Sequence, residues 1–262
     1  VTAHSNNIDW FKLYEEDDNP YLEAWWKWWP EVSKTLNILR ITGGEPLMHK
    51  STWRLFEELK ENPKPHLNIE LNSNMGVKEK LVKKLVEKLK ELKSLKAINS
   101  FKLYTSIDTW GPRASYTRTG LDIGLWERNL DYYLTNTGWP VTFMITFNLF
   151  AVTSFNKLLE KILEWRHKYN SDMQTKWQRI RFDTPYLRDP IQFDMNILPK
   201  EKFMPYMKKH LQLMHDYQDD TDRTKFSSLE VEKFRRVVDY MEKTQYDKEK
   251  LQKGRKNFYN FF

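Results

Sequence analysis

Cysteine is absent from this sequence of 262 residues. The chain therefore forms no disulfide bond and offers no thiolate, either as a metal ligand or as a nucleophile. Glycine is also scarce, at 8 residues, which argues against glycine-rich phosphate loops and against a turn-dense all-β fold. No apolar run approaches the roughly 18 residues that a membrane-spanning helix needs. The sequence also lacks the motifs of zinc proteases, P-loop NTPases and α/β-hydrolases.

Hydrophobic residues make up 40% of the chain and aromatic residues 15%, enough for a sizeable core. The formal net charge is +7, and a basic surface attracts nucleic acid, anionic lipid or acidic ligands. The charged residues are 30% of the total, however, and both signs are interspersed. Binding to nucleic acid needs a clustered basic patch and is therefore a minor alternative.

Five short apolar runs have the character of β-strands. They start 31 to 40 residues apart, a spacing typical of repeated strand–helix units with right-handed crossovers. The five predicted strands are 36–41, 67–71, 101–107, 141–149 and 178–182. Amphipathic periodicity predicts helices at 51–62, 78–96, 122–134, 154–169, 200–217 and 228–243.

Four segments need separate interpretation. The helix at 78–96 is lysine-rich, which favours a solvated outer face over a nucleic-acid-binding helix. The tryptophans of 19–32 recur at helical spacing and predict a packed aromatic face, with a substrate-facing wall as the alternative. The acidic piece 216–222 is predicted to be a loop. His210 and His215 lie five residues apart, and we expect both at the surface rather than in a metal site.

The strongest local motif follows the first predicted strand. It reads Ile-Thr-Gly-Gly-Glu-Pro-Leu over 41–47. Two adjacent glycines permit a sharp turn or a close approach of the backbone to a ligand, and the proline restricts Glu45 to an extended conformation. The carboxyl end of a strand is where α/β sheets and barrels place their sites.

This motif resembles the GGEP element that radical-SAM enzymes carry after the second strand of their barrel. The resemblance implies that Gly43, Gly44, Glu45 and Pro46 bind the amino group of the methionine part of S-adenosylmethionine (SAM). Chemically, a cationic ammonium would meet strand-end carbonyls and a carboxylate.

Further segments at the ends of predicted strands resemble the same family. Ser106 and Asp108 match its Ser-Ile-Asp segment, although the family's following glycine is displaced here to Gly111. The resemblance implies that Ser106 and Arg118 hold the SAM carboxylate, with Asp108 contacting the carboxylate or the ribose. Asn148 would reach the ribose, and Asn74 is a weaker candidate at the family's Thr-Asn-Gly position. The alternative is that Arg118 is an ordinary surface residue of a loop and that Asn148 is an ordinary strand residue, with no role in binding.

The family binds a [4Fe–4S] cluster through three cysteines in a C-x3-C-x2-C loop after its first strand. This sequence has none of them. Residues 1–10 resemble the segment after that loop, so we expect the first strand and the cluster loop to lie outside this sequence; a naturally cluster-less member is the alternative. The implied fold is an α/β partial barrel of the six-stranded TIM-like kind over 1–190, with five strands visible. A helical, twitch-like extension would follow over 191–262.

The implied function is that of a radical-SAM oxidoreductase, inactive as this chain alone. It would cleave SAM reductively at the cluster to abstract a substrate hydrogen, with a reductase or a flavodoxin-type protein as electron donor. A peptide or protein substrate and a cytoplasmic location are expected. The alternatives are a degenerate barrel that binds a ligand or a protein, and a basic nucleic-acid-binding protein.

Overall fold

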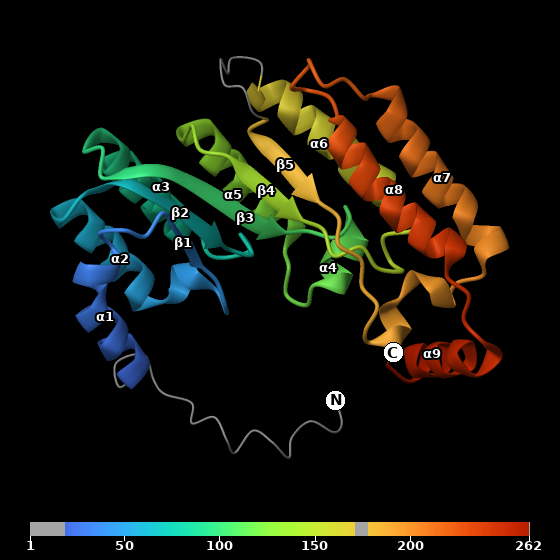
Figure 1. Cartoon of the computed structure of the whole chain (residues 1–262). Coiled ribbons are helices and arrows are strands. Elements are labelled where there is room, and N and C mark those ends of the chain that lie inside the picture. The colour runs from blue at the N-terminus through green and yellow to red at the C-terminus, as the bar shows by residue number, and fades with distance from the viewer. Residues whose placement is uncertain (1–18, 171–177, 262) are drawn as a thin grey trace.

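The computed structural model describes residues 19–170 and 178–261, and these form a mixed α/β fold around one five-stranded sheet (Figure 1). All strand pairs are parallel, and the spatial order β1-β2-β3-β4-β5 follows the order of the chain. With right-handed crossovers, this order places the connecting helices on one side of the sheet. The strands are β1 (Ile38–Ile41), β2 (Lys64–Asn72), β3 (Ile98–Ser106), β4 (Val141–Met144) and β5 (Ile180–Asp183).

Helices occupy most of the remaining described chain. Several begin at caps that the sequence supplies: Asn19 accepts from the N–H groups of Tyr21 and Leu22, and Ser227 and Glu230 form a capping box. The α-helices are α1 (Pro20–Val32), α2 (Lys50–Glu61), α3 (Glu79–Ser94), α4 (Pro112–Thr117), α5 (Ile123–Asn136), α6 (Phe155–Asn170), α7 (Lys200–Asp216), α8 (Ser228–Lys243) and α9 (Lys248–Phe261). Short 3-10 turns are η3 (Pro46–Met48), η4 (Ile191–Phe193) and η5 (Met195–Ile197).

The two faces of the sheet differ sharply in burial. Alternate residues of β2 to β5 are fully buried under the helices, among them Ile69, Leu103 and Phe143. Their neighbours on the opposite face are only half-buried and mostly polar, including Glu70, Lys102 and Arg181. We call this second surface the open face. A parallel sheet is normally covered on both faces, so a polar face that the described residues leave half-exposed is a candidate ligand-binding surface.

The C-terminal helices pack at the β5 end of the sheet, where α7 and α8 lie side by side (Figure 1). A fully buried arginine on α6 ties them to the sheet. The Arg166 guanidinium donates to the backbone carbonyls of Ile180 and Lys225 and forms an ion pair of 2.5 Å with Glu230 of α8. Both side chains of this ion pair are almost inaccessible to solvent, so the pair fixes the position of α8.

Some predictions about secondary structure are wrong in detail. The fourth strand ends at Met144, and residues 145–149 are not part of it. Beyond that point Phe147 pairs only in an isolated bridge with Tyr186, and the N–H of Leu149 donates to Phe193. The chain leaves the sheet because its next partners belong to the loop after β5. The sequence patterns do not predict helices α4 and α9, and residues 1–10 lie outside the described part of the chain.

His210 corrects another prediction, because it is buried at 1% exposure rather than lying at the surface. It shares a face of α7 with the buried Met207 and Met214, and its Nε2–H donates to the carbonyl of Val152 over 2.8 Å. His215 is exposed, as expected. The periodicity that places Met207 and Met214 in the core therefore includes His210.

Two further segments agree with the sequence interpretation. Helix α3 buries both of its valines and all of its leucines except the half-buried Leu81, and it exposes most of its lysines. On α1, Trp29 is buried and packs against Trp25 at a ring distance of 5.5 Å, whereas Trp28 is 57% exposed. Among the described residues, no helix combines the length and the apolar character that crossing a bilayer requires.

Candidate functional site

The loop after β1 carries the Gly-Gly-Glu-Pro motif at the carboxyl edge of the sheet. Gly43 and Gly44 are exposed and have φ angles of +88° and +43°, in the left-handed region that favours glycine. No atom lies within 4 Å of the place where a Cβ on Gly43 would be. The backbone of this turn is therefore open to a ligand, and the turn itself explains the need for glycine.

Glu45 ties this loop to the next one. Its Oε1 accepts from the N–H of Leu47 at the start of η3, and its Oε2 accepts from the N–H of Asn74 over 2.8 Å. The side chain of Asn74 is occupied in a local turn, where it accepts from the N–H of Gly76. The buried carboxylate thus holds the loops after β1 and β2 together, and only its remaining lone pairs are left for a ligand.

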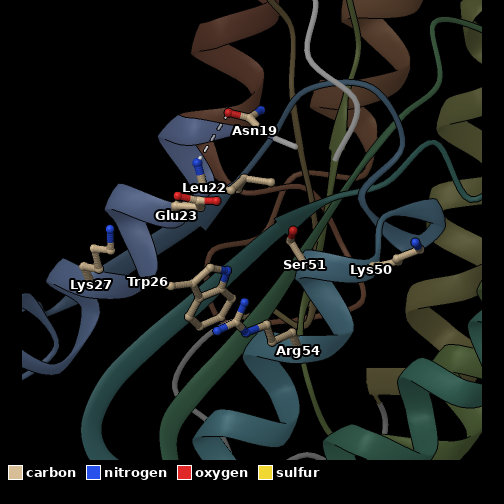
Figure 2. Close-up of a pocket in the computed structure, with 8 residues that line it drawn as sticks. All are labelled: Asn19, Leu22, Glu23, Trp26, Lys27, Lys50, Ser51 and Arg54. Atoms are coloured by element: carbon tan, nitrogen blue, oxygen red, sulfur yellow. Dashed lines mark hydrogen bonds between the residues drawn. The ribbon is translucent and has the colours of Figure 1, made fainter. Parts of the chain in front are cut away.

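Two neighbouring hollows flank the glycine turn. One, of 650 Å³, is lined by Gly43, Gly44 and Pro46 together with the start of α1. The other, of 470 Å³, lies between α1 and α2, where the Arg54 guanidinium covers the Trp26 ring at 4.1 Å (Figure 2). Asn19, Leu22 and Ser51 line both, so the two hollows are continuous beside the motif.

A second group of predicted residues meets at the ends of β3 and β4. Asp108 is 4% exposed, and its Oδ1 accepts from Arg118 Nη2 and from the N–H of Thr146, each over 2.9 Å. Burial raises the pKa of the Asp108 carboxyl above its usual value. The positive charge and hydrogen bond of Arg118, and the hydrogen bond from the Thr146 N–H, oppose this rise only in part. Within the described chain the Oδ2 atom of Asp108 accepts no hydrogen bond, so it is available to a ligand in the cavity that Asp108 lines.

That cavity has a volume of 360 Å³, and four aromatic side chains contribute to its walls. Phe150 packs edge-on against Tyr116 and lies 6.2 Å from Phe193, with the distance measured between ring centres. Phe261, from α9, packs edge-on against Phe193 and closes one side. We call this the aromatic cavity. Its polar end is the Asp108–Arg118 pair, and a planar ligand with a hydrogen-bond donor matches that chemistry.

Asn148 also lines the aromatic cavity, but its side chain supports its own loop. Its Nδ2 donates to the carbonyl of Thr146, and its Oδ1 accepts from the N–H of Phe150. Ser106 lies elsewhere, half-buried on the open face and opposite Met144 in the register of β3 and β4. The structure therefore joins Asp108, Arg118 and Asn148 in one cavity and places Ser106 outside its lining.

Sequence reasoning missed the aromatic walls and the Thr146 amide. Tyr116 lies on α4, Phe150 lies between β4 and α6, and Phe193 lies on η4, so only the fold brings them together. One signal was available, because the segment 258–262 is strongly apolar. Phe261 from that segment does line the cavity.

The sequence matches no protein-family model, and comparisons with curated proteins and with solved structures yield no match either. The assignment of function therefore depends on the residues themselves. These residues do not fit an iron–sulfur cluster, because the sequence has no cysteine to ligate its iron atoms. Nor do the described residues place three or more His, Asp or Glu side chains together as a metal site.

Proposed function

We propose that this chain is the SAM-binding part of a radical-SAM-type enzyme and that it holds SAM along the carboxyl edge of its sheet. Five parallel strands in chain order, with polar groups on the open face, are compatible with part of a TIM-like barrel. In this proposal the sheet is a partial barrel and the open face is its interior.

The observation that carries the proposal is the alignment of strand-end loops along one edge. The exposed Gly43–Gly44 turn follows β1, Asn74 follows β2, and Asp108 follows β3. The backbone of the turn would accept the ammonium of the methionyl group. The free Oδ2 of Asp108 would accept a ribose hydroxyl, and the aromatic cavity would take the adenine ring.

This chain supplies no thiolate ligand, so no step of the proposal passes through a cluster. Reductive cleavage of SAM would need a cluster held by other residues than these. What the proposal assigns to this chain is binding and orientation of SAM: an exposed backbone turn for the methionyl end, and a buried carboxylate at the polar end of the aromatic cavity for the adenosyl end.

The test is equilibrium dialysis of the purified chain with radiolabelled SAM. Asp108→Asn retains the acceptor used by Arg118 and Thr146 but replaces the free oxygen by an NH2 group. Loss of a hydrogen bond to a charged group costs about 1.5–3 kcal/mol, so the dissociation constant should rise at least about tenfold. Asp131→Asn is the matched control, since Asp131 is a half-exposed helix residue paired with Lys168.

Saturable binding that weakens in Asp108→Asn and not in Asp131→Asn would support the proposal. Absence of saturable binding at about 1 mM SAM, where the binding free energy is only about −4 kcal/mol, would refute it. Equal affinity of Asp108→Asn and the parent would also refute the assignment of Asp108.

A further inference from the structure

Helix α9 contributes to a small pocket that the proposed SAM site does not use. The pocket has a volume of 340 Å³, at the small end of the roughly 300–1,000 Å³ that is typical of ligand pockets. Its lining consists of four aliphatic side chains, two aromatic rings and one arginine. We call it the α9 pocket, and the aromatic cavity shares none of its lining residues.

The aliphatic part of the lining belongs to the core of the protein. Leu149 is 9% exposed and Ile197 is 4% exposed, so neither side chain can move far without disturbing its neighbours. Leu198 and Pro199 continue this surface toward solvent. Removal of such apolar surface from water favours binding, so a ligand of this pocket needs an apolar body.

A close backbone contact fixes α9 beside these residues. Gly254 is buried, and a Cβ added to it would lie 2.7 Å from Ile197 Cγ2 and 3.3 Å from Ile191 Cγ1. The helix therefore approaches η5 more closely than a residue with a side chain would allow. The Nε–H of the next residue, Arg255, donates to the carbonyl of Ile197 over 2.9 Å, and this bond holds the guanidinium in the lining of the pocket.

The rest of the Arg255 guanidinium is available to a ligand. Its Nη1 and Nη2 groups have no hydrogen-bond partner or ion pair within the described part of the chain. No carboxylate is among the described residues that line the pocket. Glu201 of α7 and Glu249 of α9 are both exposed and neither pairs with Arg255, so the positive charge in the lining is not balanced.

The charge of the helix itself strengthens this imbalance. Helix α9 carries five lysine or arginine residues against a single glutamate. One of them, Lys256, follows Arg255 directly and is exposed, without an ion pair in the described chain. The summed field of these charges attracts an anion to this side of the molecule.

We propose that the α9 pocket binds a small monocarboxylate with an apolar body. Its carboxylate would accept two parallel hydrogen bonds from the forked Nη groups of Arg255, and its hydrocarbon part would cover Ile197 and Leu198. A single guanidinium matches one carboxylate in charge and in geometry. The proposal is independent of SAM binding, since it uses none of the residues assigned to SAM.

The test is an NMR titration of the chain labelled with 13C at the methyl groups of isoleucine and leucine, which places probes on Leu149, Ile197 and Leu198. The ligands are 4-phenylbutyrate, its neutral amide and acetate, at constant ionic strength. The amide should bind at least about tenfold more weakly, because it cannot form the charge-assisted bonds to Arg255. Acetate should also bind at least about tenfold more weakly, because it lacks the apolar body.

Two variants separate the pocket from the general charge of the helix. Arg255→Met removes the guanidinium and keeps an unbranched side chain, so it should weaken binding of 4-phenylbutyrate about tenfold. Lys256→Met is the matched control, since it makes the same change of charge on the same helix at a residue outside the lining. It should change the dissociation constant less than about twofold, because salt screens exposed charges that are not in contact with the ligand.

Saturable shifts of the three probe residues, weakened in Arg255→Met and not in Lys256→Met, would support the proposal. Three results would overturn it: no saturation up to about 20 mM 4-phenylbutyrate, a range beyond millimolar affinity; equal affinity of the acid and its amide; or equal weakening in the two variants. The comparison of acid with amide uses the parent chain and so does not depend on the folding of any variant. Circular dichroism checks that both variants fold.

Discussion

Replacing Glu230 by glutamine removes the negative charge of the buried ion pair on α8 and leaves the shape nearly unchanged. Arg166 has an exposed side-chain fraction of 0% and Glu230 one of 7%. Arg166 would keep its hydrogen bonds to the carbonyls of Ile180 and Lys225, but its charge would be buried without a counter-ion.

The magnitude of the effect depends on that burial. Breaking a buried pair by removing one partner costs about 3–5 kcal/mol, because water cannot reach the remaining charge. For a chain of this size, each kcal/mol lowers the melting temperature by about 2–4 °C, so we expect a decrease of about 10 °C. The exposed pair Arg128–Glu79 is the matched control, and Glu79→Gln should change stability by less than about 1 kcal/mol.

Urea unfolding of the parent, Glu230→Gln, Arg166→Met and the double variant measures the coupling between the two residues. A coupling free energy of about 2 kcal/mol or more is expected for two residues in direct contact. If Glu230→Gln destabilises the protein no more than Glu79→Gln does, the ion pair does not fix α8.

Two further predictions concern buried polar groups. Glu45→Gln puts an NH2 group against the N–H of Leu47 or of Asn74, so it should destabilise the protein by about 2 kcal/mol in urea unfolding. An unchanged urea concentration at the midpoint of unfolding would contradict the role of Glu45 in holding the two loops together. Burial lowers the pKa of His210 to about 4, although its bond to Val152 opposes this. The unfolded chain therefore binds the proton first as the pH falls below about 6.5, and between pH 6.5 and 5 the parent should lose about 2 kcal/mol more stability than His210→Gln. Equal losses would contradict the burial of neutral His210.

Hydrophobic alternation and helical periodicity were sufficient to predict all five strands and most of the helices, but not α4 or α9. The helix predicted at 228–243 coincides with α8, and the one at 78–96 overlaps α3 with two residues of difference at most at either end. Both have a regular apolar stripe with charged residues opposite, the most reliable local signal. The parallel sheet was predictable from the spacing of strands and helices.

The features that the sequence did not reveal depend on long-range contacts. The fourth strand continues in an apolar run to Leu149, and only the loop after β5 shows why the sheet ends at Met144. The pairing of Glu70 with both Arg40 and Lys102 requires the register of three strands. For the candidate site, the strand-end position of Gly43–Pro46 was predictable, whereas the aromatic cavity needed contacts between segments far apart in the chain.

The sequential strand order has a kinetic consequence. Each strand pairs with the strands that precede and follow it in the chain, so every added strand closes a loop of similar, moderate length. The entropic cost of closure rises only slowly with loop length, and no pairing has to wait for a distant segment. We therefore expect the sheet to assemble strand by strand from β1, in the order in which a ribosome releases it, with α8 docking on it afterwards through Glu230.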